Sequence, residues 1–202
     1  MESHEHYYAE GYGAESDPYA MPNGVLINNL GITETRELNE IEQDLSALSL
    51  KELAQEALPE TFNFAHLRHL HKRIFDRVYP WAGELRTVDI GKGDTLFIRH
   101  QDIEKEAQKL FAKIQAEDLQ NVSLEVFSQT VGEFFIALNH IHPFREGNGR
   151  TQRLFASQLA AANGKTLNWE SVGDEAMRRA CIEGAMGNIR QMVRLILLNT
   201  KQ

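Results

Sequence analysis

Residues 142–153 read His-Pro-Phe-Arg-Glu-Gly-Asn-Gly-Arg-Thr-Gln-Arg, and they separate two amphipathic segments of the chain. The first segment is expected to end near Ile141, because Pro143 lacks a backbone N–H and its ring clashes with the preceding helical turn. After Gly149 apolar residues recur at spacings of three and four, which predicts a second helix. The stretch therefore predicts two helices joined by a glycine-rich loop at 142–150.

The residue types in this loop are those of a phosphate site. Gly147 and Gly149 lack a Cβ, so their backbone N–H groups can approach a ligand closely. The N-terminus of the following helix attracts anions through its unpaired N–H groups and its dipole. Arg150 and Arg153 are three residues apart, so both can project from one side of that helix. The segment predicts a polyphosphate bound at the helix N-terminus.

Two more residues indicate chemistry at that phosphate. Glu146 would repel it unless a cation lay between them, and Mg²⁺ bound by one carboxylate and phosphate oxygens is the usual arrangement. His142 is suited to accept a proton from a hydroxyl, because the unperturbed pKa of histidine is roughly 6.5. Each residue alone is more often a cap, a packed ring or a solvated charge. The prediction therefore depends on the ordered set.

That ordered set resembles the signature of the Fic family: His, any residue, Phe, any residue, Asp or Glu, Gly-Asn-Gly-Arg, two residues, Arg. The resemblance covers about residues 16–196, and residues 75–86 resemble the segment that precedes the family's β-hairpin flap. It implies an all-α fold of about seven or eight helices with one small β-hairpin flap at about 86–99. A single domain is expected at 25–202, after a partly irregular N-terminal strap at 1–24.

The resemblance also implies a protein adenylyltransferase, which transfers AMP from ATP to a Tyr, Thr or Ser hydroxyl. His142 would be the general base, Glu146 would hold Mg²⁺, and Phe144 would anchor the loop in the core. The phosphates of ATP would be bound by Gly147, Asn148, Gly149, Arg150 and Arg153. The flap would pair with the target as an added strand, through Val88, Ile90, Gly91 and Leu96. The intact Gly-Asn-Gly favours this transfer over phosphorylation or phosphocholine transfer.

Regulation can be inferred from a second family motif, an inhibitory helix with Ser or Thr, three residues, Glu, and then Gly or Asn. The Glu-Gly pairs at 10–11, 146–147 and 183–184 lack Ser or Thr four residues before the glutamate. The chain thus resembles the toxin of a bacterial toxin–antitoxin pair, whose small antitoxin would place a glutamate on Arg153. Relatives of this type modify the ATPase subunits of DNA gyrase and topoisomerase IV, which are the expected targets.

Composition fits a single cytoplasmic domain. The chain has 202 residues, 42% of them apolar, which suffices for one core. Its single cysteine excludes an internal disulfide. No apolar run approaches the ~20 residues that span a bilayer, and the N-terminus lacks a secretory pattern. A net charge of −8 argues against direct nucleic-acid binding.

Two other functions fit the same residues. The fold could be a non-catalytic nucleotide-responsive binding module, or it could transfer another phosphate-linked group, including transfer to water.

His66, His69 and His71 have no cysteine or carboxylate at ligand spacing, which favours a solvated or packed cluster over a metal site. The N-terminal tyrosines are either packing residues or sites of self-modification. Periodicity predicts helices at about 33–58, 63–78, 102–117, 124–141, 149–164, 171–185 and 189–197.

Overall fold

The computed structural model describes residues 8–9, 17–93 and 95–202. In these residues the chain forms seven α-helices, one short 3-10 helix and two small antiparallel sheets. The predicted all-α fold with a small β-hairpin is thereby confirmed. Much of the strap expected at 1–24, with its tyrosines at 7 and 12, lies outside the described residues. No helix in the described part is long and apolar enough to cross a membrane.

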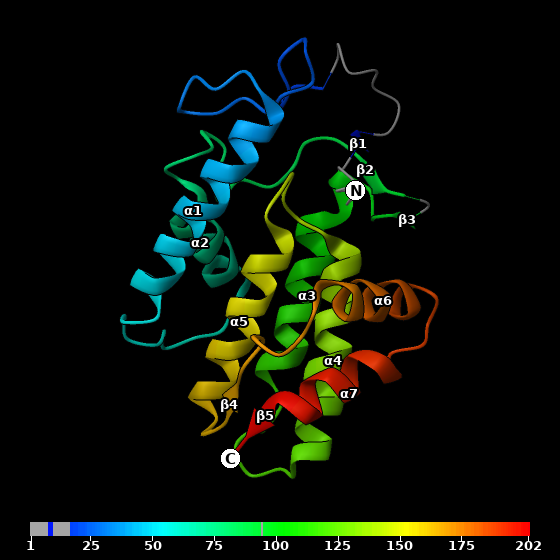
Figure 1. Cartoon of the computed structure of the whole chain (residues 1–202). Coiled ribbons are helices and arrows are strands. Elements are labelled where there is room, and N and C mark those ends of the chain that lie inside the picture. Colours follow the sequence, from blue (N-terminus) through cyan, green and yellow to red (C-terminus); the bar gives the residue numbers. More distant parts are fainter. Residues whose placement is uncertain (1–7, 10–16, 94) are drawn as a thin grey trace.

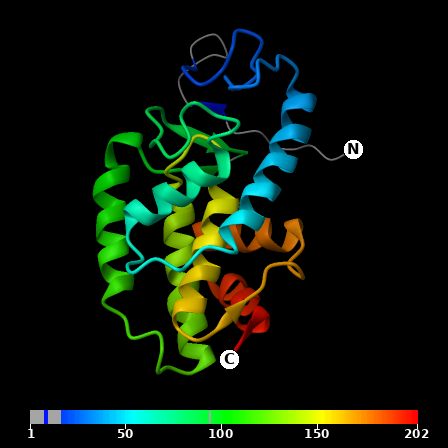
Figure 2. The ribbon, with the colours of Figure 1, turned by 90° about the vertical axis from the view of Figure 1, so that its left-hand side faces the viewer.

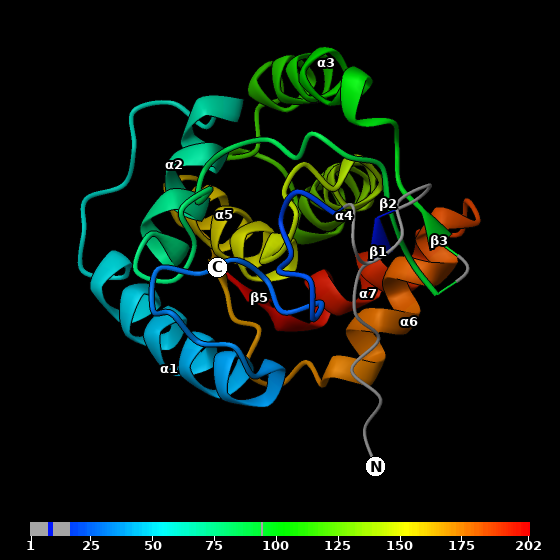
Figure 3. The same cartoon turned by 90° about the horizontal axis from the view of Figure 1, so that it is seen from above.

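Helix α4 (Leu124–Ile141) is the centre of the fold. It packs against α3 (Ile103–Gln115), α5 (Asn148–Ala162), α6 (Asp174–Ala185) and α7 (Arg190–Asn199). Figure 3 looks along α4 and α5 and shows the other helices arranged around this pair. The buried residues of α4 include Phe127, Gly132 and Ile136, which lie on different sides of the helix. Such a helix needs partners on more than one side.

Two helices cover α5 on the side away from α4. Helix α2 (Phe64–Phe75) packs on α5, and α1 (Thr35–Leu53) packs on α2, as Figure 2 shows. Asn63 caps α2 by accepting the N–H of His66 at 2.8 Å. Both helices end earlier than predicted. The chain leaves α2 after Phe75 in a tight turn, in which the N–H of Val78 donates to the Phe75 carbonyl at 2.9 Å.

The C-terminal part differs from the sequence prediction in two details. The helix predicted to begin at about residue 171 begins at Asp174 as α6, with Gly173 as its N-cap, and the Ser171 hydroxyl donates to the Asn199 side chain. Strands β4 (Thr166–Leu167) and β5 (Thr200–Lys201) form a small antiparallel sheet. Strands of two residues are too short for a period-2 pattern to reveal them.

The flap is a β-hairpin of β2 (Ile90–Lys92) and β3 (Thr95–Leu96), in which Gly91 pairs with Leu96. Strand β1 (Tyr8–Ala9) pairs antiparallel with the other edge of β2, so that Tyr8 lies opposite Gly91. Figure 1 places this sheet and the loop between α4 and α5 at the same end of the molecule, away from the C-terminus. The fold therefore brings the flap to the loop that the sequence singled out.

Candidate active site

The loop between α4 and α5 contains two residues with a left-handed backbone. His142 has φ 47° and ends α4, where its N–H donates to the Leu138 carbonyl at 3.0 Å. Gly147 has φ 78° and precedes α5, and a Cβ added there would lie 2.3 Å from Cε2 of Phe75. Glycine is therefore required at 147. His142 instead adopts a conformation that costs a residue with a Cβ on the order of 1–3 kcal/mol.

The ring of His142 is held in one tautomer. Nδ1 lies 2.9 Å from the Asn139 carbonyl oxygen, which can only accept, so Nδ1 carries the proton and Nε2 has the lone pair. Phe97 stacks on the ring with centroids 3.8 Å apart. Burial, aided by the nearby charges of Arg86 and Lys92, lowers the pKa of His142 to about 3. The ring is therefore neutral at physiological pH, with Nε2 as the acceptor.

Phe144 and Asn148 close the loop on itself. The Phe144 side chain is buried in the core, consistent with the anchoring role predicted for it. The Asn148 side chain accepts the Phe144 N–H at 3.0 Å and donates to the Phe144 carbonyl at 2.8 Å. The sequence prediction assigned the Asn148 amide to the phosphates, whereas here both ends of that amide fix the shape of the loop.

His71 of α2 bonds to the backbone of the loop. Its ring is fully buried and stacks on Phe144 with centroids 3.8 Å apart. Nδ1 accepts the Gly83 N–H at 2.8 Å, so Nε2 carries the proton and donates to the Glu146 carbonyl at 2.9 Å. Burial lowers the pKa of His71 to about 3. The packed histidine of α2 is thus a neutral bridge to the catalytic loop, a role that sequence analysis missed.

The carboxyl group of Glu146 is placed to attract a cation. It is partly buried, and one of its oxygens accepts the N–H of Gly147 at 2.9 Å. Loss of solvent, followed by the negative charge of Glu42, raises its pKa. The described residues contain no cluster of three or more His, Cys, Asp or Glu side chains suited to a metal. A divalent ion at Glu146 would take its other ligands from phosphates and water, as Mg²⁺ commonly does.

Arg150 points toward α1. Its guanidinium forms an ion pair with Glu42, donates to the Ser46 hydroxyl at 2.8 Å, and lies 4.6 Å from the centre of the Phe75 ring. The Tyr79 hydroxyl donates to the second oxygen of Glu42. The positive charge of Arg150 is therefore partly offset by the carboxylate of Glu42. Sequence analysis did not predict this partner.

Arg153 lies one helical turn after Arg150 on α5. Its Nη1 is 3.5 Å from the position that a Cβ on Gly149 would take. The Arg153 carbonyl accepts the indole N–H of Trp169 at 3.0 Å. A Cβ at Gly149 would be in ordinary van der Waals contact with the guanidinium, so Arg153 lies beside the start of the helix, where the prediction placed the distal phosphates.

The loop is also tied to the N-terminal segment. Arg145 forms an ion pair with Asp17 at 2.8 Å, and the side chains of both residues are less than one tenth exposed. The other oxygen of Asp17 accepts the Tyr19 N–H at 3.0 Å. The Tyr19 hydroxyl accepts the N–H of Thr87 at 3.0 Å, which joins the same segment to the base of the flap.

The flap side chains lie differently from the prediction. Val88 and Ile90 are buried in a small cluster with Tyr19, so they cannot contact a target in this arrangement. The backbone of Gly91 pairs with Leu96 on one side and with Tyr8 on the other. Only Leu96 of the predicted docking residues is substantially exposed. Alternation identifies the two faces of a strand but does not show which face another segment covers, so the docking role of the flap stays a prediction.

Comparison with known proteins identifies relatives of the whole chain. The Fic/DOC family profile matches residues 61–160. Probable protein adenylyltransferase y4lH of Sinorhizobium fredii is 38% identical over 182 residues, which are 88% of this chain and 93% of that protein. Protein adenylyltransferase VbhT of Bartonella schoenbuchensis is 37% identical over 190 residues. That match covers 93% of this chain but 40% of the length of VbhT.

Solved structures show the same fold. The N-terminal Fic domain of a putative cell filamentation protein from Bartonella quintana, with bound ADP, has a TM-score of 0.85 and 30% identity, covering 91% of this chain and 94% of that one. BepC from Bartonella tribocorum, with bound AMPPNP, has a TM-score of 0.84 and 27% identity, covering 91% and 96%. Both structures were obtained with an adenine nucleotide bound.

Proposed function

The chain is a protein adenylyltransferase of the Fic/DOC family, and we propose that it transfers AMP from ATP to a Tyr, Thr or Ser hydroxyl with His142 as the general base. The observation that carries this proposal is the tautomer of His142. The bond from Nδ1 to the Asn139 carbonyl leaves Nε2 as the proton acceptor, in a loop that opens the N-terminus of α5.

In the proposed reaction, the hydroxyl oxygen attacks the α-phosphorus of ATP and its proton passes to Nε2 of His142. The bond between the α-phosphorus and the bridging oxygen breaks, and pyrophosphate leaves. The pKa of about 3 describes the buried ring without substrate. Anionic phosphates beside it would stabilise the imidazolium and raise that pKa. Positioning and charge stabilisation then supply most of the catalysis.

Glu146 is the residue of the loop that fits Mg²⁺. Its pKa is raised by burial and by Glu42, and a cation beside it would favour the charged carboxylate. Bound there, Mg²⁺ would offset the charge on the phosphates and on the departing pyrophosphate.

The phosphates would bind at the start of α5. The first backbone N–H groups of a helix, here those around Gly147 and Gly149, lack partners within the helix, and the helix dipole favours an anion there. Arg150 would contact the chain of phosphates while still paired with Glu42, and Arg153 would bind the γ-phosphate beside Gly149. In this proposal the Asn148 amide contributes shape and not a direct phosphate contact.

The biological role is inferred from the inhibitory motif that the Glu-Gly pairs of the sequence do not match. We infer a toxin whose targets are the ATPase subunits of DNA gyrase and topoisomerase IV, restrained by a small antitoxin that places a glutamate on Arg153. Its support is that none of the Glu-Gly pairs in the sequence has the Ser or Thr of an inhibitory helix. Expression without a partner should arrest bacterial growth, and His142→Ala should abolish the arrest. Normal growth at high levels of active protein would contradict this role.

The direct test uses ATP labelled at either the α- or the γ-phosphate. The protein, Mg²⁺ and a bacterial lysate are incubated with each form, in parallel with His142→Ala and with His140→Ala. His140 is exposed and lies two residues from His142, which makes it a matched control. We expect a protein band labelled only from the α-position. His142→Ala should lower the rate by roughly 10²–10⁴-fold, and His140→Ala should leave it unchanged.

The alternative functions predict other outcomes of the same experiment. Label from the γ-position would indicate a kinase-like orientation of ATP. Turnover of ATP without labelled protein would indicate transfer to water. Binding of ATP without turnover or label, in a folded protein, would indicate another donor or a nucleotide-responsive binding module.

A further inference from the structure

Arg86 is a buried arginine at the base of the flap. Its side chain is completely inaccessible to solvent, although its guanidinium group is charged and costs free energy to bury. Burial lowers its pKa to about 10, which still leaves it charged at neutral pH. Arg86 forms a long ion pair with Asp89, whose Oδ1 lies 3.9 Å from Nη1. A buried charge of this kind has to be satisfied mainly by hydrogen bonds.

One set of these bonds reaches the catalytic loop. Nε of Arg86 donates to the carbonyl of His142 at 2.8 Å, and Nη2 donates to the carbonyl of Ile141 at 3.2 Å. The backbone N–H of Arg86 donates to the carbonyl of Pro143 at 2.9 Å. Arg86 thus holds three consecutive carbonyls, centred on the one residue other than glycine that has a positive φ in the described part of the chain.

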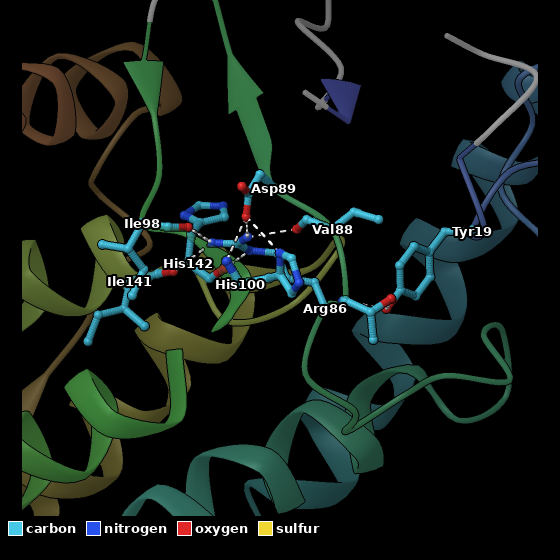
Figure 4. Close-up of polar contacts among 9 residues, drawn as sticks. Tyr19, Arg86, Val88, Asp89, Ile98, His100, Ile141 and His142 are labelled. Atoms are coloured by element: carbon cyan, nitrogen blue, oxygen red, sulfur yellow. Dashed lines mark hydrogen bonds and ion pairs between the residues drawn. The ribbon is translucent and has the colours of Figure 1, made fainter. Parts of the chain in front are cut away.

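The other set reaches the two ends of the flap. Nη1 of Arg86 donates to the carbonyl of Val88 at 2.7 Å, and Nη2 donates to the carbonyl of Ile98 at 2.5 Å. Val88 precedes β2 and Ile98 follows β3, so the guanidinium lies between the two flap strands and the loop (Figure 4). The planar fork of arginine can satisfy this set of acceptors, whereas the ammonium of lysine has three donors on one atom.

We propose that Arg86 is a positioning residue that fixes the orientation of His142 relative to the flap, an inference that rests on the proposed function. Its bonds hold the carbonyls of residues 141–143, and these set the backbone that directs the His142 ring. The same guanidinium holds both ends of the flap, which carries Phe97 onto that ring. Displacement of the flap therefore displaces the general base.

The test compares Arg86→Lys with a matched control, Arg68→Lys. Arg68 also donates through Nε to a backbone carbonyl, that of Gly83 at 3.0 Å, but it is partly exposed and does not contact the loop. Nitrogen NMR of ¹⁵N-histidine protein reports the tautomer of His142, whose signal is assigned with His142→Ala. We expect one Nδ1–H tautomer in the wild type and in Arg68→Lys, and a mixture of tautomers in Arg86→Lys.

The transfer assay with α-labelled ATP gives a second measurement. Arg86→Lys should lower the turnover number about tenfold or more while the KM for ATP changes little, because ATP contacts other residues. A folded Arg86→Lys with an unchanged His142 tautomer and rate would overturn the inference. If the wild type transfers no label, the proposed function fails, and the NMR comparison still decides whether Arg86 orients His142.

A measurement on the wild type covers the case in which Arg86→Lys does not fold. The coupling across a hydrogen bond between Nε of Arg86 and the carbonyl carbon of His142 can be observed in ¹⁵N,¹³C-labelled protein. We expect this coupling to be present. Its absence in the folded wild type would overturn the inference as well.

Discussion

The loop at 142–147 is held by hydrogen bonds to its backbone from one pair of residues and by ion pairs from another. The backbone-binding pair is Arg86 at the base of the flap and His71 of α2, and both lie inside the range 61–160 that the family profile matches. On the N-terminal side, the loop region meets two carboxylates, Asp17 and Glu42, which both precede that range.

The two kinds of bond control different properties. Hydrogen bonds to carbonyls have strict directions, so Arg86 and His71 determine where the reacting groups lie. Ion pairs add or remove charge, so Asp17 and Glu42 determine how positive the loop is when ATP arrives. Changes to Arg86 or His71 should therefore act on geometry and rate as well as on stability, and changes to Asp17 or Glu42 on stability and anion affinity.

The largest effect should come from Asp17→Ala, which removes the carboxylate that pairs with the buried charge of Arg145. Loss of one member of such a pair costs about 3–5 kcal/mol of the free energy of unfolding, measured by urea denaturation. The exposed Asp44 provides the control variant Asp44→Ala, which should change little. Adding Arg145→Leu to Asp17→Ala should recover part of the loss. A change below about 1 kcal/mol would show that the pair does not hold the loop.

The next largest effect should come from His71→Phe, which tests the hydrogen bonds to the loop backbone. The variant keeps an aromatic ring against Phe144 but removes both hydrogen bonds of His71. The Gly83 N–H and the Glu146 carbonyl would then lack partners. This should cost roughly 2–4 kcal/mol of the free energy of unfolding, at about 1–2 kcal/mol for each group left without its partner. His69 lies on the same helix and is exposed, so His69→Phe is the matched control and should be nearly neutral.

Acid should lower the stability of the protein through the two buried histidines of this region, His71 and His142. The pKa values of His71 and His142 are both lowered to about 3, below the roughly 6.5 of an unfolded chain. The unfolded state therefore binds more protons between these values, and stability falls as the pH falls below about 6.5. Each histidine should contribute about 2 kcal/mol of loss between pH 7 and pH 5.

The measurement is the free energy of unfolding at both pH values in the wild type, His71→Phe and His142→Ala. Each variant should lose about 2 kcal/mol less than the wild type on acidification, because it lacks one of the two groups. Equal losses in all three proteins would show that the buried rings are not the source of the acid sensitivity.

The sequence revealed the loop and its helices because their signals are local. Pro143, Gly147 and the apolar periodicity of α4 and α5 each act within a few residues. The carboxylates were missed because Asp17 is 128 residues from Arg145 and Glu42 is 108 residues from Arg150. Nothing in a linear pattern links charges at such separations.

The burial of His71 could have been predicted from the sequence, whereas the inward direction of Val88 and Ile90 could not. His71 lies four residues after Leu67 and three before Ile74, so the helical period already places it on the buried stripe of α2. That signal could have separated it from the exposed His69. The inward direction of Val88 and Ile90 was not readable in the same way, because it depends on Tyr19 covering them from another segment.

The smallest effect tests the charge on the N-terminal side through Glu42→Gln. Glutamine can still accept a hydrogen bond from Arg150, but it no longer offsets the positive charge. We expect MgATP to bind about fivefold more tightly, which corresponds to roughly 1 kcal/mol, while adenosine binds as before. Glu40→Gln on the exposed side of α1, where Glu40 pairs with Arg36, is the control and should change neither affinity. Isothermal titration of all three proteins with MgATP and adenosine measures this directly. Weaker binding of MgATP by Glu42→Gln would mean that Glu42 holds Arg150 in place, and that the N-terminal side contributes geometry as well as charge.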